Sequence, residues 1–155
     1  MLVDITAVPR LEHLLDIRIE FAPAQLVPTP LGMRVTCVIR DGRFAGAATG
    51  TVLPGGGDWV LVDADGVARL DVRATLRTDD GALIHLTNTG RAVLDDDTRH
   101  RYLAGEFIGH DACYARSSPL FDTADPRYRG LTGLHTVAIN ALSLTSVHYR
   151  VFAVR

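Results

Sequence analysis

The sequence predicts an all-β fold: a single closed antiparallel β-barrel with one short helix, occupying residues 1–155 as one domain. Short runs rich in β-branched and aromatic residues follow one another from residue 13 onward, separated by glycine and aspartate turns. One segment alone carries the signals of a helix. We favour a closed sheet because closure leaves no strand edge exposed.

Nine strands are expected, over residues 13–21, 33–40, 43–53, 59–62, 67–78, 82–91, 112–117, 134–143 and 145–154. The run 59–62 is apolar on both faces, because Val60 and Val62 point opposite to Trp59 and Leu61. One face can line the barrel. The other then needs cover from the helix or from a second subunit, so we expect a homodimer.

The stretch VLPGGGDW, residues 52–59, joins two of these strands. A phosphate-binding loop would need lysine after its glycines, and a dinucleotide fingerprint would open a helix; this stretch does neither. Pro54 and the three glycines are typical of a sharp reversal that can include a bulge. In the functional alternative, Asp58 and Trp59 lie at the barrel mouth and contact a bound substrate.

Residues 67–91 predict a β-hairpin with two distinct faces. Even positions from 68 to 76 are apolar, and the odd positions between them are polar. A three-residue loop, Asp79-Asp80-Gly81, pairs Leu76 with Ile84. A two-residue loop would instead set Leu76 against His85. We choose the longer loop because it keeps the apolar residues on one face.

Residues 95–104 are the expected helix, because acids crowd the first turn and Gly105 stands at the end. In the strand that follows, alternation places Tyr114 and Arg116 on one face and Cys113 on the other. We expect Cys113 to be a buried, unreactive thiol.

Residues 118–131 (SPLFDTADPRYRGL) are long for a connection and rich in turn residues. We therefore expect a lid that contributes Phe121 or Tyr128 to substrate binding.

The composition excludes several chemistries and partners. The chain has no lysine, so a Schiff base or a lysine nucleophile is excluded. A formal net charge of −2 gives no bulk attraction to nucleic acid or to an anionic membrane. No apolar run reaches the length of a membrane span, and we see no signal peptide, so we expect a cytoplasmic protein.

No metal or other cofactor is expected. The six histidines show no HxH, HxxH or HExxH spacing. His85, His135 and His148 lie on separate expected strands and could still converge on a metal. Cys37 and Cys113 leave one disulfide possible, without a cysteine framework.

Two expected strand faces carry polar side chains that could form one wall. They are Asp71, Arg73, Thr75 and His85 on the hairpin, and Tyr114 and Arg116 on the later strand. In one interpretation this wall is simply solvated. In the other it lines a barrel of eight or nine strands, which is wide enough to hold one small ligand.

If the wall faces inward, we predict that Arg73, His85, Tyr114 and Arg116 are catalytic. His85 would move a proton, Tyr114 would donate one, and the arginines would stabilise an oxyanion. A substrate of carboxylate, enolate or phenolate character would suit buried arginines.

The remaining predicted contacts are substrate-binding. Asp71 would orient an arginine or the histidine, and Asp58 and Trp59 would lie near the mouth of the barrel.

Four stretches together resemble the domain-of-unknown-function family 3237, a group of small, mostly bacterial, uncharacterised proteins. They are VLPGGGDW, DGVARLDVRATLRTDDGALIHLTNTG, YARSSPLFDTADPRY and VHYRVFAV. The resemblance implies a barrel similar to those of lipocalins and allene-oxide-cyclase-like proteins, and it implies no particular reaction. Residues 128–132 depart from the family pattern, which usually has an aromatic residue and an asparagine there. If they line a pocket in relatives, specificity cannot be carried over.

Three functions compete at this point. The first is a cofactor-independent lyase, isomerase or cyclase that transfers a proton on a small molecule bearing a carbonyl or carboxylate group. The second is a lipocalin-like protein that binds a small molecule without turnover, and the third is a structural subunit. The exclusions above leave acid–base chemistry as the least demanding enzymatic route.

Overall fold

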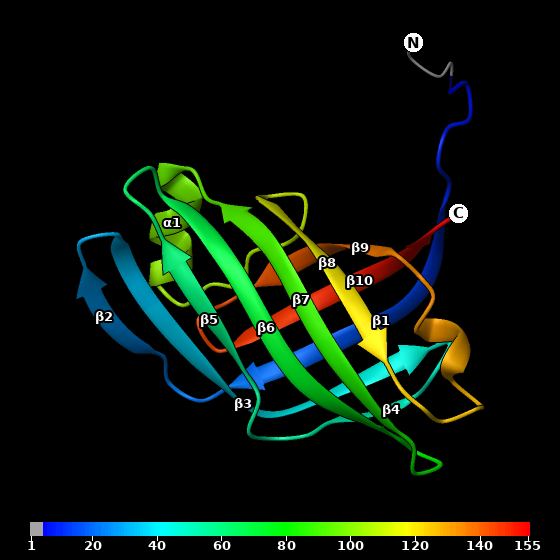
Figure 1. Cartoon of the computed structure of the whole chain (residues 1–155). Coiled ribbons are helices and arrows are strands. Elements are labelled where there is room, and N and C mark those ends of the chain that lie inside the picture. The colour runs from blue at the N-terminus through cyan, green and yellow to red at the C-terminus, as the bar shows by residue number, and fades with distance from the viewer. Residues whose placement is uncertain (1–4) are drawn as a thin grey trace.

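The computed structural model describes residues 5–155, so the first four residues of the predicted domain lie outside the described residues (Figure 1). Within the described range there are ten strands, one α-helix and one short 3-10 helix. The strands are β1 (Leu11–Phe21), β2 (Gln25–Thr29), β3 (Gly32–Gly46), β4 (Gly50–Val52), β5 (Gly57–Val62), β6 (Val67–Thr78), β7 (Leu83–Val93), β8 (Tyr114–Asp122), β9 (Thr136–Leu142) and β10 (Ser146–Val154). The helices are α1 (Asp96–Leu103) and η1 (Arg129–Leu131).

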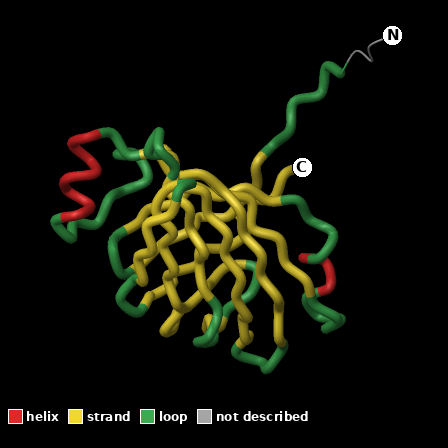
Figure 2. The backbone as a smooth tube through the Cα atoms, turned by 60° about the vertical axis from the view of Figure 1, so that its left-hand side comes forward, coloured by secondary structure: helices red, strands yellow, loops and turns green. Residues whose placement is uncertain are grey.

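The sheet closes on itself, as predicted. Its strands follow the order β1-β10-β9-β8-β7-β6-β4-β3, and β3 pairs back onto β1. Both β4 and β5 pair with β3 on one side and with β6 on the other, so together they fill one of eight strand positions. Figure 2 shows the continuous strand wall, with α1 and η1 at opposite sides of it. The fold is therefore a closed antiparallel β-barrel with one short α-helix.

Apolar side chains fill the interior of the barrel. In β1, Leu15, Ile17 and Ile19 are almost wholly buried, while Asp16 and Arg18 between them are exposed. Strands β6, β7, β8 and β10 alternate in the same way. Each fully buried aliphatic side chain contributes about 1.5–3 kcal/mol. The apolar face of each strand is therefore the face that points inward.

The β6–β7 hairpin has the predicted register. Leu76 pairs with Ile84, and Thr75 pairs with His85. Gly81 has a φ of 93°, which is the left-handed region that the three-residue loop requires. The choice of the longer loop is confirmed.

The glycine stretch is a bulge, and it does not reverse the chain. Since β4 and β5 both run antiparallel to β3, the chain continues in one direction through residues 53–56. It advances five residues from Val52 to Gly57, while its partner on β3 moves back four, from Gly42 to Val38. The predicted reversal is wrong and the bulge is correct, because the glycines absorb an extra residue without leaving the sheet.

Several strands differ from the prediction. The expected strand over residues 43–53 is divided, because residues 43–46 end β3 and residues 50–52 form β4, and the strand expected over residues 112–117 is β8, over residues 114–122. β3 is unbroken across residues 41–42, because β1 and β4 pair with it there on its two sides. The sequence does not predict β2, because Pro28 interrupts the apolar run. Of the described strands, only β3 pairs with β2, and such an edge position tolerates a proline.

The predicted helix is present and capped. Asp95 is the N-cap of α1, and its Oδ1 accepts a hydrogen bond from the Thr98 N–H at 2.8 Å. Hydrogen bonding from Thr98 lowers the pKa of the Asp95 carboxyl group. Gly105, with a φ of 90°, follows the helix as expected.

Replacing this cap should loosen α1. We expect Asp95→Ala to cost the helix about 1 kcal/mol, so amide hydrogen exchange at Thr98 should be about fivefold faster. Asp96→Ala is the matched control, because Asp96 makes only an exposed ion pair with Arg99, at 3.6 Å. Equal exchange rates in the two variants would contradict a capping role for Asp95.

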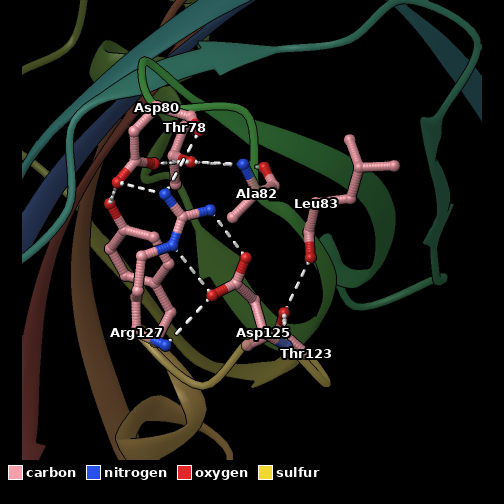
Figure 3. Close-up of polar contacts among 8 residues, drawn as sticks. Thr78, Asp80, Ala82, Leu83, Thr123, Asp125 and Arg127 are labelled. Carbon is pink, nitrogen blue, oxygen red and sulfur yellow. Dashed lines mark hydrogen bonds and ion pairs between the residues drawn. The ribbon is translucent and has the colours of Figure 1, made fainter.

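The predicted lid lies at the opposite end of the barrel from α1 (Figure 1). Its first part continues β8, and the loop after it is fastened to the β6–β7 turn (Figure 3). The Arg127 guanidinium forms ion pairs with the carboxylates of Asp80 and Asp125, with N–O distances of 3.0 and 2.8 Å. The Tyr128 hydroxyl donates a hydrogen bond to Asp80 Oδ2 at 2.8 Å. Hydrogen bonding from Arg127 lowers the pKa of Asp125 to about 2. The atypical residues 128–132 lie in this fastened loop.

Candidate functional site

Polar side chains occur on the inner wall of the barrel, in one belt across neighbouring strands. Cys37 pairs with Asp58, Asp58 with Val72, Val72 with Asn88, and Asn88 with Pro119. Asp58 and Asn88 are buried, and Cys37 is half-buried. A thiol, a carboxyl group and a carboxamide therefore face the interior at a similar height.

Asp58 is fixed by its own strand and by the next one. Pairing of β5 with β6 stops after Asp58 and resumes at Leu61, and in this gap the Asp71 N–H donates to Asp58 Oδ1 at 3.0 Å. Burial raises the pKa of the Asp58 carboxyl group to about 6; the hydrogen bond opposes this rise and the Asp71 charge adds to it. Near neutral pH this carboxyl group can both accept and release a proton.

Three further groups near Asp58 stay protonated at neutral pH. Burial raises the pKa of Cys37 to about 11 and that of Tyr102, on α1, to about 12. The fully buried Tyr149 hydroxyl has a pKa raised well above its usual value, also mainly by burial. The charge of Asp58 contributes to all three shifts, so these groups lie within its electrostatic reach.

The Asn88 side chain makes no well-formed hydrogen bond. It is fully buried, and neither its Nδ2 nor its Oδ1 makes a hydrogen bond of normal geometry with a described residue. The amide is close enough to the Tyr149 hydroxyl to lower the pKa of that group somewhat. Asn140, the other buried carboxamide, instead exchanges hydrogen bonds with Ser117, at 3.1 and 3.2 Å. Only a few buried polar groups in a native protein are left unpaired in this way.

Side chains of the barrel interior are less buried toward the α1 end. The inward-facing side chains of Val35 and Leu70 are only half-buried there, as is Tyr102. Toward the η1 end, Leu76 and Phe121 are almost wholly buried and close the barrel. The polar belt thus lies between a less buried end and a packed end.

The predicted catalytic wall faces the other way. Arg73 and His85 are exposed on the outer face of the hairpin, and Asp71 is half-buried beside them. The alternation was correctly assigned, but Val72 and Leu86 occupy the interior, because burying a row of charged groups would cost far more than burying apolar ones. The prediction that this wall lines the barrel cavity is wrong.

Tyr114 and Arg116 also lie outside the barrel. The Arg116 guanidinium stacks 5.2 Å from the Tyr114 ring centroid, in an outer-surface groove of about 440 Å³. A larger outer groove, of about 640 Å³, crosses β1, β3, β9 and β10 and is lined by Arg18 and Arg43. Neither groove is lined by Cys37, Asp58 or Asn88.

Of the predicted substrate-binding residues, only Asp58 lies on the belt. Trp59 points outward and is 43% exposed, whereas Val60 faces the interior. Phe121 belongs to the packed core, and Tyr128 lies in the fastened loop at the far end. The outer face of β5 at Trp59 is thus not covered by the helix, and its cover by a second subunit stays a prediction.

Two of the residues that the sequence analysis missed had a usable signal. Asn88 follows Ile84 and Leu86 on the buried face of its strand, and Tyr149 alternates with Val147 and Val151. A polar atom on an apolar face is the signal in both strands. Tyr102 had none, because only the fold brings α1 to the barrel end.

Both cysteines are free thiols, so the possible disulfide does not form. Within residues 5–155, no three histidine, cysteine, aspartate or glutamate side chains converge as a metal site would require, so the three strand histidines do not meet. No helix in this part of the chain has the length and apolar character needed to cross a membrane.

The fold and the site define a class of protein: a small closed β-barrel whose inner wall carries a carboxyl group and an amide without a hydrogen bond. The chain belongs to the family described as protein of unknown function DUF3237, whose model matches residues 9–154.

Several known proteins are similar to this chain. A UPF0311 protein of Clostridium acetobutylicum is 37% identical over 100 residues, which is 64% of this chain and 63%, less than two thirds, of that relative. A conserved protein of unknown function from Rhodopseudomonas palustris has a crystal structure with a TM-score of 0.91 at 24% identity, covering 97% of this chain and 100% of its own. An enzyme from Penicillium herquei has a TM-score of 0.74 at 21% identity, covering 99% and 100%. The last two likenesses show the fold.

Proposed function

We propose that the protein binds a small organic molecule at the α1 end of the barrel interior and transfers a proton on it through Asp58. One observation carries this proposal. A buried carboxyl group, that of Asp58, and a buried amide without a hydrogen bond, that of Asn88, lie on the same belt of the inner wall. A barrel built for stability alone would hold apolar side chains there, because buried polar groups cost free energy unless they are paired.

The reaction class is that of a lyase, isomerase or cyclase working by general acid–base catalysis. Asp58 is the proton-transferring group, because a pKa of about 6 suits transfer near neutral pH. Tyr102 and Tyr149 supply hydroxyl donors for the oxygen that becomes negative as a carbon-bound proton leaves. Cys37 remains a thiol, which argues against a thiolate nucleophile.

The fold is compatible with catalysis, since the Penicillium herquei protein that shares it is described as an enzyme. The likeness supports the fold, and the choice of acid–base chemistry depends on the residues of the belt.

The proposal can be tested with 5-nitrobenzisoxazole, a general probe for a desolvated carboxylate base. The base removes the ring C–H proton, the N–O bond breaks, and a coloured cyanonitrophenolate forms. We expect the protein to catalyse this ring opening, with a rate that rises with pH around about 6 as Asp58 loses its proton. Asp58→Asn should lower the rate by about 100-fold or more.

Asp122→Asn is the matched control, because Asp122 is an exposed carboxylate on the outer end of β8. This variant should keep the wild-type rate. Equal rates in wild type and Asp58→Asn, or a loss of rate in His85→Ala, would contradict the proposal. Saturable binding of the probe without ring opening would assign the barrel to the non-catalytic binding proteins.

A further inference from the structure

The belt offers a bound molecule no positive charge. Among residues 5–155, the buried polar side chains comprise one carboxyl group, two carboxamides and several hydroxyl groups, and no arginine or histidine. An anionic group that entered the interior would meet the Asp58 carboxylate without a compensating cation. Burying a charge without a partner in this way is strongly unfavourable.

A cationic group is also poorly matched to a proton-transfer site. An ammonium group beside Asp58 would hold the carboxylate as an ion pair and lower its pKa, because an opposite charge favours the ionised form. Asp58 would then be a weaker base. The group that reaches the belt should therefore carry no charge.

The Asn88 amide specifies the polar groups of such a molecule. Its Nδ2 is a donor and its Oδ1 an acceptor, both fully buried and both without a partner among the described residues. Asn88 and Asp58 flank Val72 on the inner wall, one strand to each side of it. A ligand that presents an acceptor beside a donor can satisfy both amide atoms while another of its atoms faces Asp58.

We infer that the substrate is an uncharged molecule with a hydrogen-bond acceptor and a donor side by side, such as a carboxamide, a lactam or a carbonyl group with a neighbouring hydroxyl. This inference rests on the proposed function and adds the substrate class. It replaces the anionic substrate that inward-facing arginines would have favoured, because every arginine of the described chain is exposed or half-buried.

Three probes with the same ring test the inference: benzamide, benzoate and benzylamine. At about pH 7.5 the first is neutral, the second anionic and the third cationic. Saturation-transfer NMR on the full chain should detect benzamide binding, at least about tenfold tighter than binding of either charged probe. Asn88→Leu should weaken benzamide binding by about tenfold or more, because it removes both polar atoms and keeps the branched shape of the side chain. Thr87→Val is the control, because Thr87 is a half-buried neighbour on the outer face of β7, and this variant should leave binding unchanged. Asn140→Leu would not serve, since it breaks the hydrogen bond between Asn140 and Ser117.

The result separates this inference from the proposed function. Benzoate binding as tight as benzamide binding would overturn the inference, and this comparison needs no variant, so it holds even if Asn88→Leu fails to fold. Benzamide binding that is insensitive to Asn88→Leu would overturn it as well. If the neutral probe binds through Asn88 but Asp58→Asn leaves 5-nitrobenzisoxazole turnover unchanged, the substrate class stands and the acid–base function fails.

Discussion

Asp58→Asn should make the barrel more stable above pH 6 by about 3 kcal/mol. The folded protein holds the Asp58 proton with a pKa of about 6, against an ordinary value of 3.8, mainly because the carboxyl group is buried. The difference corresponds to about 3 kcal/mol of free energy lost when the group is ionised in the folded state. The asparagine Oδ1 can still accept from the Asp71 N–H, so the substitution removes the charge and keeps the hydrogen bond.

The sign of the pH dependence follows from the raised pKa. Between about pH 4 and pH 6 the folded state binds more protons than the unfolded state, so the wild-type free energy of unfolding should fall as pH rises through this window. In Asp58→Asn this contribution should be absent. The variant should gain little at pH 4 and the full amount above pH 6.

Urea unfolding at a series of pH values measures both effects. Asp65→Asn, an exposed acid in the β5–β6 turn, controls for the change in net charge and should shift stability by less than about 0.5 kcal/mol. An Asp58→Asn variant no more stable than wild type at neutral pH would show that the carboxyl group is not held in a desolvating site. Combined with the loss of ring-opening activity, the expected gain would mark Asp58 as a residue kept for function at a cost in stability.

Gly56→Ala should have the second large effect, in the opposite direction. A Cβ at this position would lie 2.3 Å from the Arg73 carbonyl oxygen and 3.1 Å from the Ala74 Cα, both backbone atoms of β6. Because neither can move without opening the sheet beside the bulge, we expect the free energy of unfolding to drop by about 3 kcal/mol or more.

Two other glycines separate this clash from the general effects of alanine. Gly130→Ala adds a Cβ that meets nothing within 4 Å, so stability should stay within about 0.5 kcal/mol of wild type. At Gly55 the surroundings are also open but φ is 100°, so alanine should cost about 1–2 kcal/mol through backbone strain alone. If Gly56→Ala costs no more than Gly55→Ala, the close approach of the bulge to β6 has no energetic weight.

The sequence alone determined those features that depend on neighbouring residues. Alternation in β6 and the Asp79-Asp80-Gly81 turn specified the hairpin register, because a one-residue slip would move every apolar side chain to the wrong face. The acids and Gly105 around α1 located the helix, because capping groups act within a single turn.

Only the tertiary structure decided which strand face became the inside of the barrel and which polar groups lie on it. Local alternation is equally consistent with a polar interior and with a polar exterior, and the choice follows from the summed burial of apolar faces across eight strand positions, which favours apolar side chains inside. Ring closure then brought Cys37, Asp58 and Asn88, far apart in the sequence, onto one belt, and the fold placed Tyr102 of α1 within electrostatic reach of Asp58. These contacts span long stretches of chain, so no short pattern could specify them.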